Sequence, residues 1–369
     1  MRRWTKQILG MVAALTPLIG GGARAEFYQI TDLGPGTATS VNASGQAAGF
    51  MGVPPHAALY SGGGVIDLGV LPGFERSQAS GINAAGQVVG SSTRQVGQQV
   101  VTHAFLYSNG VTTDLHTLFG SASSSTATGI NAAGQIVGAV FSTPSLPRAF
   151  LLSGGTVTDL GVLPGRDRSF ANALNASGQV VGYSGTPGVL GDAHAFLYSG
   201  GSMRDLGVLP GFSTSVANAI NAAGQVVGYA SRLEGTDEVR HAFLYSNGVM
   251  TDLGVLSGTY SEAFGINTAG QIVGSSFSSP FEPHAVLFNG GTVIDLNSLV
   301  LDGAGWTLQY AYGINDDGQI VGTGFFWGQS RAFLLTAVPE PSTLVLTLAG
   351  GALLLLGMSG RHCKSARAR

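Results

Sequence analysis

The stretch GINAAGQVVG, residues 81–90, decides the fold of this chain, because residues 219–228 repeat it with one change. Taken alone, its glycines invite comparison with a phosphate-binding loop. Its core, Asn-x-x-Gly-Gln, however, occurs seven times at spacings of 41 to 48 residues. A repeat period of this size indicates a protein built from stacked structural units. The seven copies begin at Asn42, Asn83, Asn131, Asn175, Asn221, Asn267 and Asn315.

Two further patterns keep step with the first. A cationic residue followed by Ala-Phe-Leu-Tyr, or a close variant, begins at His56, His103, Arg148, His194, His241, His284 and Arg331. An Asp-Leu pair begins at Asp32, Asp67, Asp114, Asp159, Asp205, Asp252 and Asp295. Three patterns in register exclude a chance match and make the repeat the basis for every other interpretation of the sequence.

Each unit contains four short strand-like segments, as the fourth unit illustrates with residues 156–160, 170–174, 179–183 and 194–198. Gly, Ser, Asn or Pro bounds each segment, which is typical of strands. Ser-Asn-Gly or Ser-Gly-Gly after the last segment predicts a type I′ hairpin to the next unit. The turn from Asn83 to Gly86 is predicted to be type I, with the Asn side chain bonding the backbone two residues on.

The predicted fold is all-β, a β-propeller of seven four-stranded blades. The last segment of each unit is apolar on both faces, so its sheet must be covered on both sides, as propeller blades are. Residues 27–33 and 331–335 are an unpaired first strand and an unpaired last strand, and we expect them to pair and close the ring. The alternative, an open β-solenoid, would require polar capping repeats, which the sequence lacks.

The three patterns together resemble the HAF family of bacterial extracellular repeats. The resemblance covers residues 27–335, with Arg148 and Arg331 in place of the usual His and with degenerate first and last units. It implies an extracellular setting and no known chemistry.

The two ends of the chain are interpreted as export and sorting segments around a repeat domain at residues 26–337. Residues 1–25 have a basic start, an apolar run and an Ala-x-Ala site, which predicts a signal peptide. Arg2-Arg3 leaves a twin-arginine route open. Residues 343–360 carry no charge and are followed by the basic tail 361–369, which predicts one C-terminal transmembrane helix with the domain outside.

Residues 338–342, VPEPS, precede this span and include Pro339, Glu340 and Pro341. Together with the span and the tail they resemble a PEP-CTERM sorting signal, over residues 338–369. The resemblance implies an exosortase-type sorting protease as a partner and a link to exopolysaccharide or biofilm matrix. A plain membrane anchor is the alternative.

Charge and motif content exclude several functions. Residues 26–337 contain 9 Arg, no Lys and 19 Asp plus Glu, a formal charge of −10, so no nucleic-acid partner is expected. The sequence holds no nucleotide-binding loop, HExxH, GxSxG or CxxC motif, and Cys363 is the single cysteine. We therefore expect no cofactor, no metal and no catalytic residue.

The repeated polar residues are interpreted as structural. Five histidines in register could suggest a metal, but one per blade places them far apart, and Arg, which does not ligate metals, fills the same position twice. We expect each His or Arg to bond either a backbone carbonyl or a repeated Asp near the hairpin. The structural positions are His56, His103, His194, His241, His284, Asp67, Asp159, Asp205, Asp252, Asn83 and Asn221.

Binding is expected in the connections that differ between units, because variable loops on a repeated scaffold commonly carry function. The connections at residues 91–102, 230–240 and 323–330 should gather on one face of a propeller. The ligand-binding candidates are Arg94, Arg166, Arg168, Arg232, Glu234, Asp237, Phe326 and Trp327.

The sequence therefore predicts an exported, surface-associated binding or structural protein, with extracellular polysaccharide or surface proteins as partners. Phe326 and Trp327 could stack on sugar rings. A propeller hydrolase or lyase acting on glycans, and a spacer for display, are the alternatives.

Overall fold

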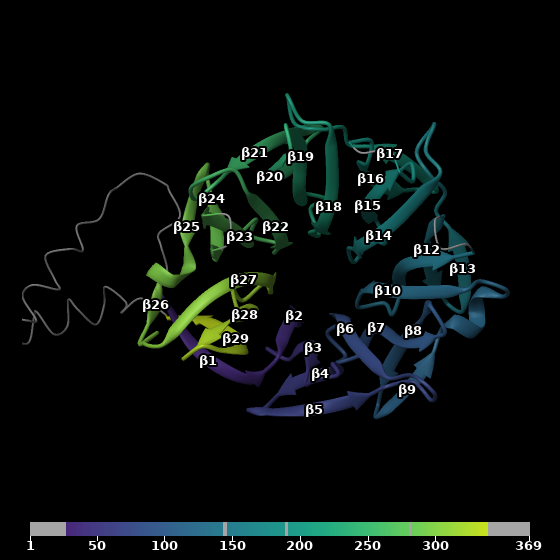
Figure 1. Ribbon diagram of the computed structural model, residues 1–369, viewed down its shortest axis with the longest axis horizontal. Coiled ribbons are helices and arrows are strands. Elements are labelled where there is room, and N and C mark those ends of the chain that lie inside the picture. The colour runs from purple at the N-terminus through teal and green to yellow at the C-terminus, as the bar shows by residue number, and fades with distance from the viewer. Residues whose placement is uncertain (1–26, 143–145, 189–190, 280–281, 339–369) are drawn as a thin grey trace, which may run out of the picture.

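The computed structural model describes residues 27–142, 146–188, 191–279 and 282–338. They form seven sheets, each built on four antiparallel strands and arranged in a ring, a seven-bladed β-propeller (Figure 1). Six sheets have four strands, and the seventh has four strands plus a short fifth one at its outer edge. The predicted all-β propeller of seven four-stranded blades is confirmed.

The strands of each blade follow from the inside of the ring outwards. Blades 1 to 3 are β2 (Thr37–Val41), β3 (Ala47–Met51), β4 (His56–Ser61), β5 (Gly64–Gly69); β6 (Arg76–Ile82), β7 (Val88–Val96), β8 (Gln99–Ser108), β9 (Val111–Asp114); and β10 (Ser124–Ile130), β11 (Ile136–Phe141), β12 (Pro147–Ser153), β13 (Thr156–Asp159). Blades 4 to 6 are β14 (Arg168–Leu174), β15 (Val180–Gly185), β16 (His194–Ser199), β17 (Ser202–Asp205); β18 (Thr214–Ile220), β19 (Val226–Glu234), β20 (Asp237–Ser246), β21 (Val249–Gly254); and β22 (Ser261–Ile266), β23 (Ile272–Ser279), β24 (Glu282–Asn289), β25 (Thr292–Asp295).

Blade 7 combines both ends of the described chain. It consists of β27 (Trp306–Ile314), β28 (Ile320–Phe326), β29 (Gln329–Ala337), β1 (Tyr28–Pro35) and the edge strand β26 (Val300–Leu301). Strand β1 pairs antiparallel with β29, from Tyr28 opposite Ala337 to Pro35 opposite Arg331. The predicted closure of the ring by its first and last strands is confirmed. Two short 3₁₀ helices, η1 (His116–Phe119) and η2 (Leu296–Ser298), lie in connections between blades.

The predicted turns are present at the repeated positions. Asn109 and Gly110 have φ angles of 51° and 82°, the two positive values that a type I′ hairpin requires. In the opening stretch the amide of Gly86 donates to the carbonyl of Asn83, and the amide of Ala85 donates to the Asn83 side chain. Gly90 is needed for another reason: a Cβ there would collide with the carbonyl oxygen of Gln78 on the inner strand. The glycines thus serve turns and close strand packing.

The hydrophobic core consists of seven clusters, one at each interface between adjacent blades. At the interface of blades 4 and 5, for example, Val181 and Ala195 pack against Ala217 and Phe243, all at most 2% exposed. The closing interface joins Ala58 and Tyr60 of blade 1 to residues of blade 7. Both faces of every blade are therefore covered, as the apolar pattern of the repeats predicts.

A closed circle of side-chain hydrogen bonds joins the seven blades. The amide nitrogen of each repeated Asn donates to the backbone carbonyl of the Asn in the next blade, at 2.9–3.1 Å. The last bond, from Asn315 to Asn42, spans 273 residues and completes the circle. These side chains are buried. The sequence indicated the turn made by each Asn but not this contact between blades.

The antiparallel strand order gives the ring two different faces. One face, the turn face, carries the connections between first and second strands and the hairpins between third and fourth strands. The other, the loop face, carries the connections between second and third strands and those that lead to the next blade. The connections that vary between units therefore gather on the loop face, as expected.

The predicted signal peptide, sorting motif and C-terminal span fall almost wholly outside the described residues, which end at Val338. Among the helices within the described ranges, none is long and apolar enough to cross a membrane.

Replacing Asn221 with Ala is expected to lower the free energy of unfolding by about 2–4 kcal/mol. The change removes a buried amide that bonds Gln225 and Asn267 and a side-chain oxygen that accepts two backbone amides. Urea unfolding followed by circular dichroism measures the loss. The exposed Ser202→Ala, in the same chain, should change stability by less than about 0.5 kcal/mol; equal losses would contradict the role of the circle.

Candidate functional site on the loop face

The repeated His and Arg residues on the loop face each bind an aspartate. The Nδ1 atom of each His lies 2.7–3.0 Å from an Asp Oδ2, and Arg148 and Arg331 form ion pairs of 3.2 and 2.8 Å. The sequence allowed either a backbone carbonyl or a repeated Asp as the partner, and in the structure the partner is the Asp. The pairs are His56–Asp67, His103–Asp114, Arg148–Asp159, His194–Asp205, His241–Asp252, His284–Asp295 and Arg331–Asp32.

The second oxygen of each aspartate holds the connection to the next blade. It accepts the backbone amide two residues on, as Asp205 does from Gly207 at 2.7 Å. Each pair therefore fastens the third strand of its blade to the start of that connection. Within the described residues no group of three or more His, Cys, Asp or Glu side chains could hold a metal ion. The His–Asp and Arg–Asp pairs therefore have a structural role on the loop face, and a binding site there must use other residues.

The predicted variable loops of blades 2 and 5 are extended hairpins. Strands β7 and β8 remain paired up to Val96 opposite Gln99, and β19 and β20 up to Glu234 opposite Asp237. Arg94 and Arg232 lie at equivalent positions on these hairpins. Most of each connection is therefore strand, because the ladder of backbone hydrogen bonds continues to a two-residue turn.

Most of the charged binding candidates have structural partners. The guanidinium of Arg94 lies 5.0 Å from the ring of Phe74, and that of Arg232 lies 4.7 Å from the ring of Phe212. Arg232 also pairs with Glu234. Asp237 is exposed at the hairpin turn.

At the position of these two phenylalanines, unit four has Arg166, which forms an ion pair of 3.0 Å with Asp192. Arg166 therefore also has a partner within the protein.

The aromatic candidates form a protruding cluster on blade 7. Phe326 stacks on Trp306 with ring centroids 5.1 Å apart, and Trp327 lies beside Phe326 at 6.2 Å. Trp327 is 74% exposed and has a φ angle of 50°. The other non-glycine residues with positive φ in the described chain are Asn or Asp, which tolerate this region, whereas Trp does not.

The strained turn at Trp327 is held by its neighbours. The Trp327 amide donates to the carbonyl of Gly305 at 2.9 Å, and the indole lies so close to Gly305 that no side chain would fit there. An apolar ring displayed to solvent at the expense of backbone strain is more typical of a binding group than of a packing group.

A central channel of about 240 Å³ runs between the inner strands. Each inner strand has a bulge at its middle, and the bulged residue lines the channel. These residues differ between blades. In blade order they are Thr39, Ser80, Thr128, Asn172, Asn218, Phe264 and Tyr312.

The inner strands differ from one another at their loop-face ends, beyond the residues that line the channel. Two residues before each bulge, on the loop-face side, blades 1 to 3 have Thr37, Gln78 and Thr126, whereas blades 4 to 7 have Phe170, Val216, Glu262 and Tyr310. We call this end of the channel the mouth. The first three residues are polar, whereas the other four are two aromatic residues, a valine and a glutamate.

An ion cluster that sequence analysis missed lies at the mouth between blades 5 and 6. Arg240 donates to Glu262 at 2.8 Å and to Glu238 at 3.0 Å, and its guanidinium lies 3.9 Å from the ring of Tyr229. Tyr260 donates to Glu262 at 3.2 Å. Glu262 is 9% exposed and is the one charged residue that is buried among the described residues. The sequence signals were a Glu in place of the Thr, Gln, Val or aromatic residue of other units, and the charged connection at residues 230–240.

The tyrosines of this cluster are held in their neutral form. Burial raises the pKa of Tyr229 to about 12, and the nearby Glu262 adds to the rise while Arg240 opposes it. Burial, with the charge and hydrogen bond of Glu262, also raises the pKa of Tyr260. At neutral pH these hydroxyls act as hydrogen-bond donors and acceptors.

Arg168 is the remaining candidate, and it begins the inner strand of blade 4 at the mouth. Its Nε is buried without a hydrogen-bond partner, and no ion pair involves it among the described residues. Arg168 lies on the same side of the sheet as Tyr183, whose register partner is Phe170, two residues after Arg168. Burial raises the pKa of Tyr183, and the charge of Arg168 opposes that rise.

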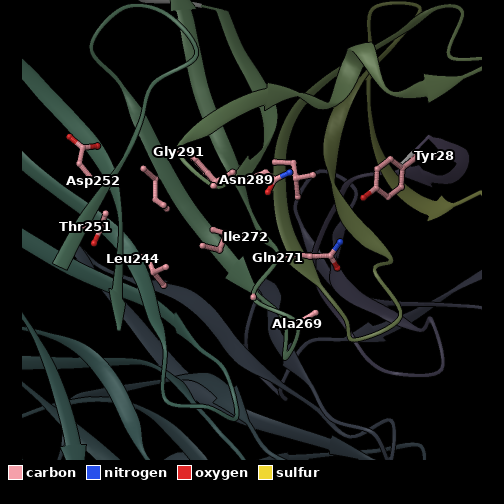
Figure 2. Close-up of a pocket in the computed structure, with 14 residues that line it drawn as sticks. Tyr28, Leu244, Thr251, Asp252, Ala269, Gln271, Ile272, Asn289 and Gly291 are labelled. Atoms are coloured by element: carbon pink, nitrogen blue, oxygen red, sulfur yellow. The ribbon is translucent and has the colours of Figure 1, made fainter. Parts of the chain in front are cut away.

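A second hollow, of about 350 Å³, lies between blades 5 and 6 on the turn side (Figure 2). Figure 2 shows its wall, where Leu244 and Ile272 are apolar, Gln271 follows a turn and Asn289 ends β24. Its one carboxylate, Asp252, is already bound by His241. Nothing in its lining favours it over the mouth as a binding site.

Comparisons with known proteins assign neither a family nor a function to the chain. No protein-family model matches the chain, and no curated protein matches it in sequence. TolB from Acinetobacter baumannii is similar in structure, with 11% identity and a TM-score of 0.40 over 88% of this chain and 67% of TolB. A prolyl endopeptidase is similar at 9% identity and a TM-score of 0.48, over 81% of this chain but only 46% of its own length.

Trypanosoma rangeli sialidase in complex with sialic acid is similar at 12% identity and a TM-score of 0.42, over 96% of this chain and 64% of that chain. Likeness at these levels transfers no ligand and no activity to the present chain.

Replacing His194 with Ala is expected to lower stability by less than about 1 kcal/mol, because its partner Asp205 is 45% exposed and exposed pairs contribute little. His194→Arg is the matched control, since Arg148 and Arg331 make the same bond in other blades. Thermal unfolding compares the three proteins. An equal loss of stability in both variants would show that the bond to Asp205 is not the cause of the loss.

Tyr229 should ionise near pH 12 instead of its usual 10. The raised pKa means that the folded state favours the neutral phenol; this stabilisation is complete below pH 10 and is lost as the pH rises through 12. The difference in absorbance at 295 nm between the protein and its Tyr229→Phe variant isolates the group. A difference titration centred near pH 10 would refute the burial argument.

Proposed function

We propose that this protein is an exported, surface-associated propeller that binds extracellular polysaccharide through the aromatic cluster of Trp306, Phe326 and Trp327. The observation that carries the proposal is the exposed, strained Trp327, held above Gly305 beside two further rings. The flat faces of aromatic rings pack against the C–H faces of sugar rings, and Trp offers the largest such face. Burial of these rings against a ligand would offset the free-energy cost of exposing them to water in the free protein.

The cluster favours a chain-like ligand over a small molecule. It stands on an inner strand and a protruding hairpin of the same blade, where register places Trp306 opposite Phe326. It does not line an enclosed pocket, so a ligand would lie across it. The acidic charge of the domain disfavours nucleic acid as that ligand.

Export and sorting remain part of the proposal. The signal peptide at residues 1–25 and the PEP-CTERM-like segment at residues 338–369 support secretion, handling by an exosortase-type protease and a membrane anchor that is at least transient. A polysaccharide of the cell surface or matrix is the ligand class that such a location offers.

A glycan-degrading enzyme is the alternative function, and the buried Glu262 is the observation that favours it. A buried carboxyl group near a channel is a typical general acid. Against this, Glu262 accepts hydrogen bonds from Arg240, Tyr260 and Asn218, which occupy its oxygens. We therefore place the ligand on the aromatic cluster and give Glu262 a structural role.

Replacing Trp327 with Ala is expected to weaken polysaccharide binding by roughly tenfold or more, since loss of an aromatic stacking group costs about 1–3 kcal/mol. The full chain contains three tryptophans, and two of them lie in the cluster. In a Trp4→Phe background, fluorescence titration with soluble polysaccharides therefore reports on the cluster directly.

Leu233→Ala is the matched control, because Leu233 is 57% exposed on a different hairpin. It should bind like the parent protein. Equal weakening in both variants, or no fluorescence change with any glycan, would refute the proposed site. Release of shorter glycans during the titration would favour the enzyme.

A further inference from the structure

We propose that Arg168, Tyr183 and Phe170 form a subsite at the mouth of the channel that binds a sugar residue carrying one carboxylate, such as a hexuronate. This inference rests on the proposed glycan-binding function and adds a ligand class to it. The subsite belongs to blade 4, whose strands β14 and β15 supply all three side chains.

The first support is the lack of a partner for Arg168. Among the nine arginines of the described chain, five pair with carboxylates, and Arg94 and Arg204 lie over aromatic rings. Arg76 is exposed to water. Arg168 alone is half-buried with neither kind of partner and with a buried, unbonded Nε. A partly dehydrated guanidinium without an anion is a ready site for a planar carboxylate, which it can bind with two hydrogen bonds.

The second support is the ring surface beside it. Phe170 and Tyr183 are opposite one another on neighbouring strands, and their rings stack with centroids 4.9 Å apart and planes 16° apart. Phe141 of blade 3 packs against the edge of Phe170. Arg168 stands two residues before Phe170 on β14 and so lies on the same side of the sheet as both rings, which places a cation and a hydroxyl on one aromatic side of the blade. Sugar acids need both a charge partner and a flat apolar surface.

The third support is that no other blade combines these groups. Arg76 of blade 2 occupies the register of Arg168, but the two positions that correspond to Phe170 and Tyr183 are Gln78 and Ser91. Blade 5 has Tyr229 at the second of these positions but Thr214 at the start of its inner strand. Only blade 4 therefore combines these three side chains. A residue set that differs from the repeat is expected of a binding site and not of the repeated scaffold.

Among the described residues, the ion pairs around the subsite leave the guanidinium of Arg168 without a carboxylate in contact. The neighbouring Arg166 is neutralised by Asp192, and the adjacent Asp167 is exposed. One guanidinium thus remains to be matched. Deeper in the channel, Asn172 donates to the carbonyl of Ala217 at 2.8 Å, which fixes an amide oxygen near the subsite as an acceptor for a sugar hydroxyl.

The test is titration calorimetry of the full chain with oligogalacturonate and with its methyl ester, which has the same rings without the charges. The parent should bind the acid more tightly than the ester. Arg168→Gln should weaken binding of the acid by roughly tenfold to a hundredfold, because a hydrogen bond to a charged group contributes about 1.5–3 kcal/mol. Tyr183→Phe should weaken it by less.

Arg76→Gln is the matched control, since it removes an equivalent arginine from a blade without the aromatic pair. It should bind the acid like the parent, and unchanged thermal unfolding should show that every variant is folded. Equal binding of acid and ester, or full binding by Arg168→Gln, would overturn the inference. A sulfated dextran that binds through Arg168 more tightly than oligogalacturonate would overturn its carboxylate part.

The two proposals can fail separately. If neutral glycans bind and lose affinity on Trp327→Ala while Arg168→Gln changes nothing, the polysaccharide function stands and the acid subsite does not. If no glycan binds at all, both fail.

Discussion

Closure of the ring is the constraint on which the rest of this structure depends. Each blade is apolar on both faces, so a blade without two neighbours would expose a hydrophobic sheet to water. Strand β1 completes the last blade and supplies the missing neighbour for the first. The circle of seven Asn bonds depends on the same closure, because each amide needs the carbonyl of the next blade and the final one returns to Asn42.

A closed repeat leaves function to the residues that differ between units. The His–Asp pairs, the Asn circle and the packed Ala-Phe positions are nearly the same in every blade, and their polar groups are satisfied within the scaffold. Asymmetry appears in two places on one side of the ring, the protruding aromatic cluster of blade 7 and the aromatic residues at the channel mouth. Both offer rings together with hydrogen-bonding groups, so both suit sugars.

The candidate site was only partly predictable. Trp327, Phe326 and Arg168 stood out because they interrupt a repeated pattern, and the structure leaves them available. Arg94, Arg166 and Arg232 interrupt it as well, yet each has an aromatic or carboxylate partner from another segment. The cluster of Arg240, Glu262 and Tyr260 was missed, since its members come from two blades and become neighbours only when the blades pack.

By itself the sequence determined the number of blades, their strands, their turns and the pairing of the two ends. These features depend on local chemistry, such as turn geometry at Asn83 and Gly86, and on a period repeated seven times. Only the tertiary structure decided which polar groups are satisfied. Each bond of the Asn circle joins residues at least 41 positions apart, as Asn42 and Asn83 are, and no local pattern records which side chains such distances bring together.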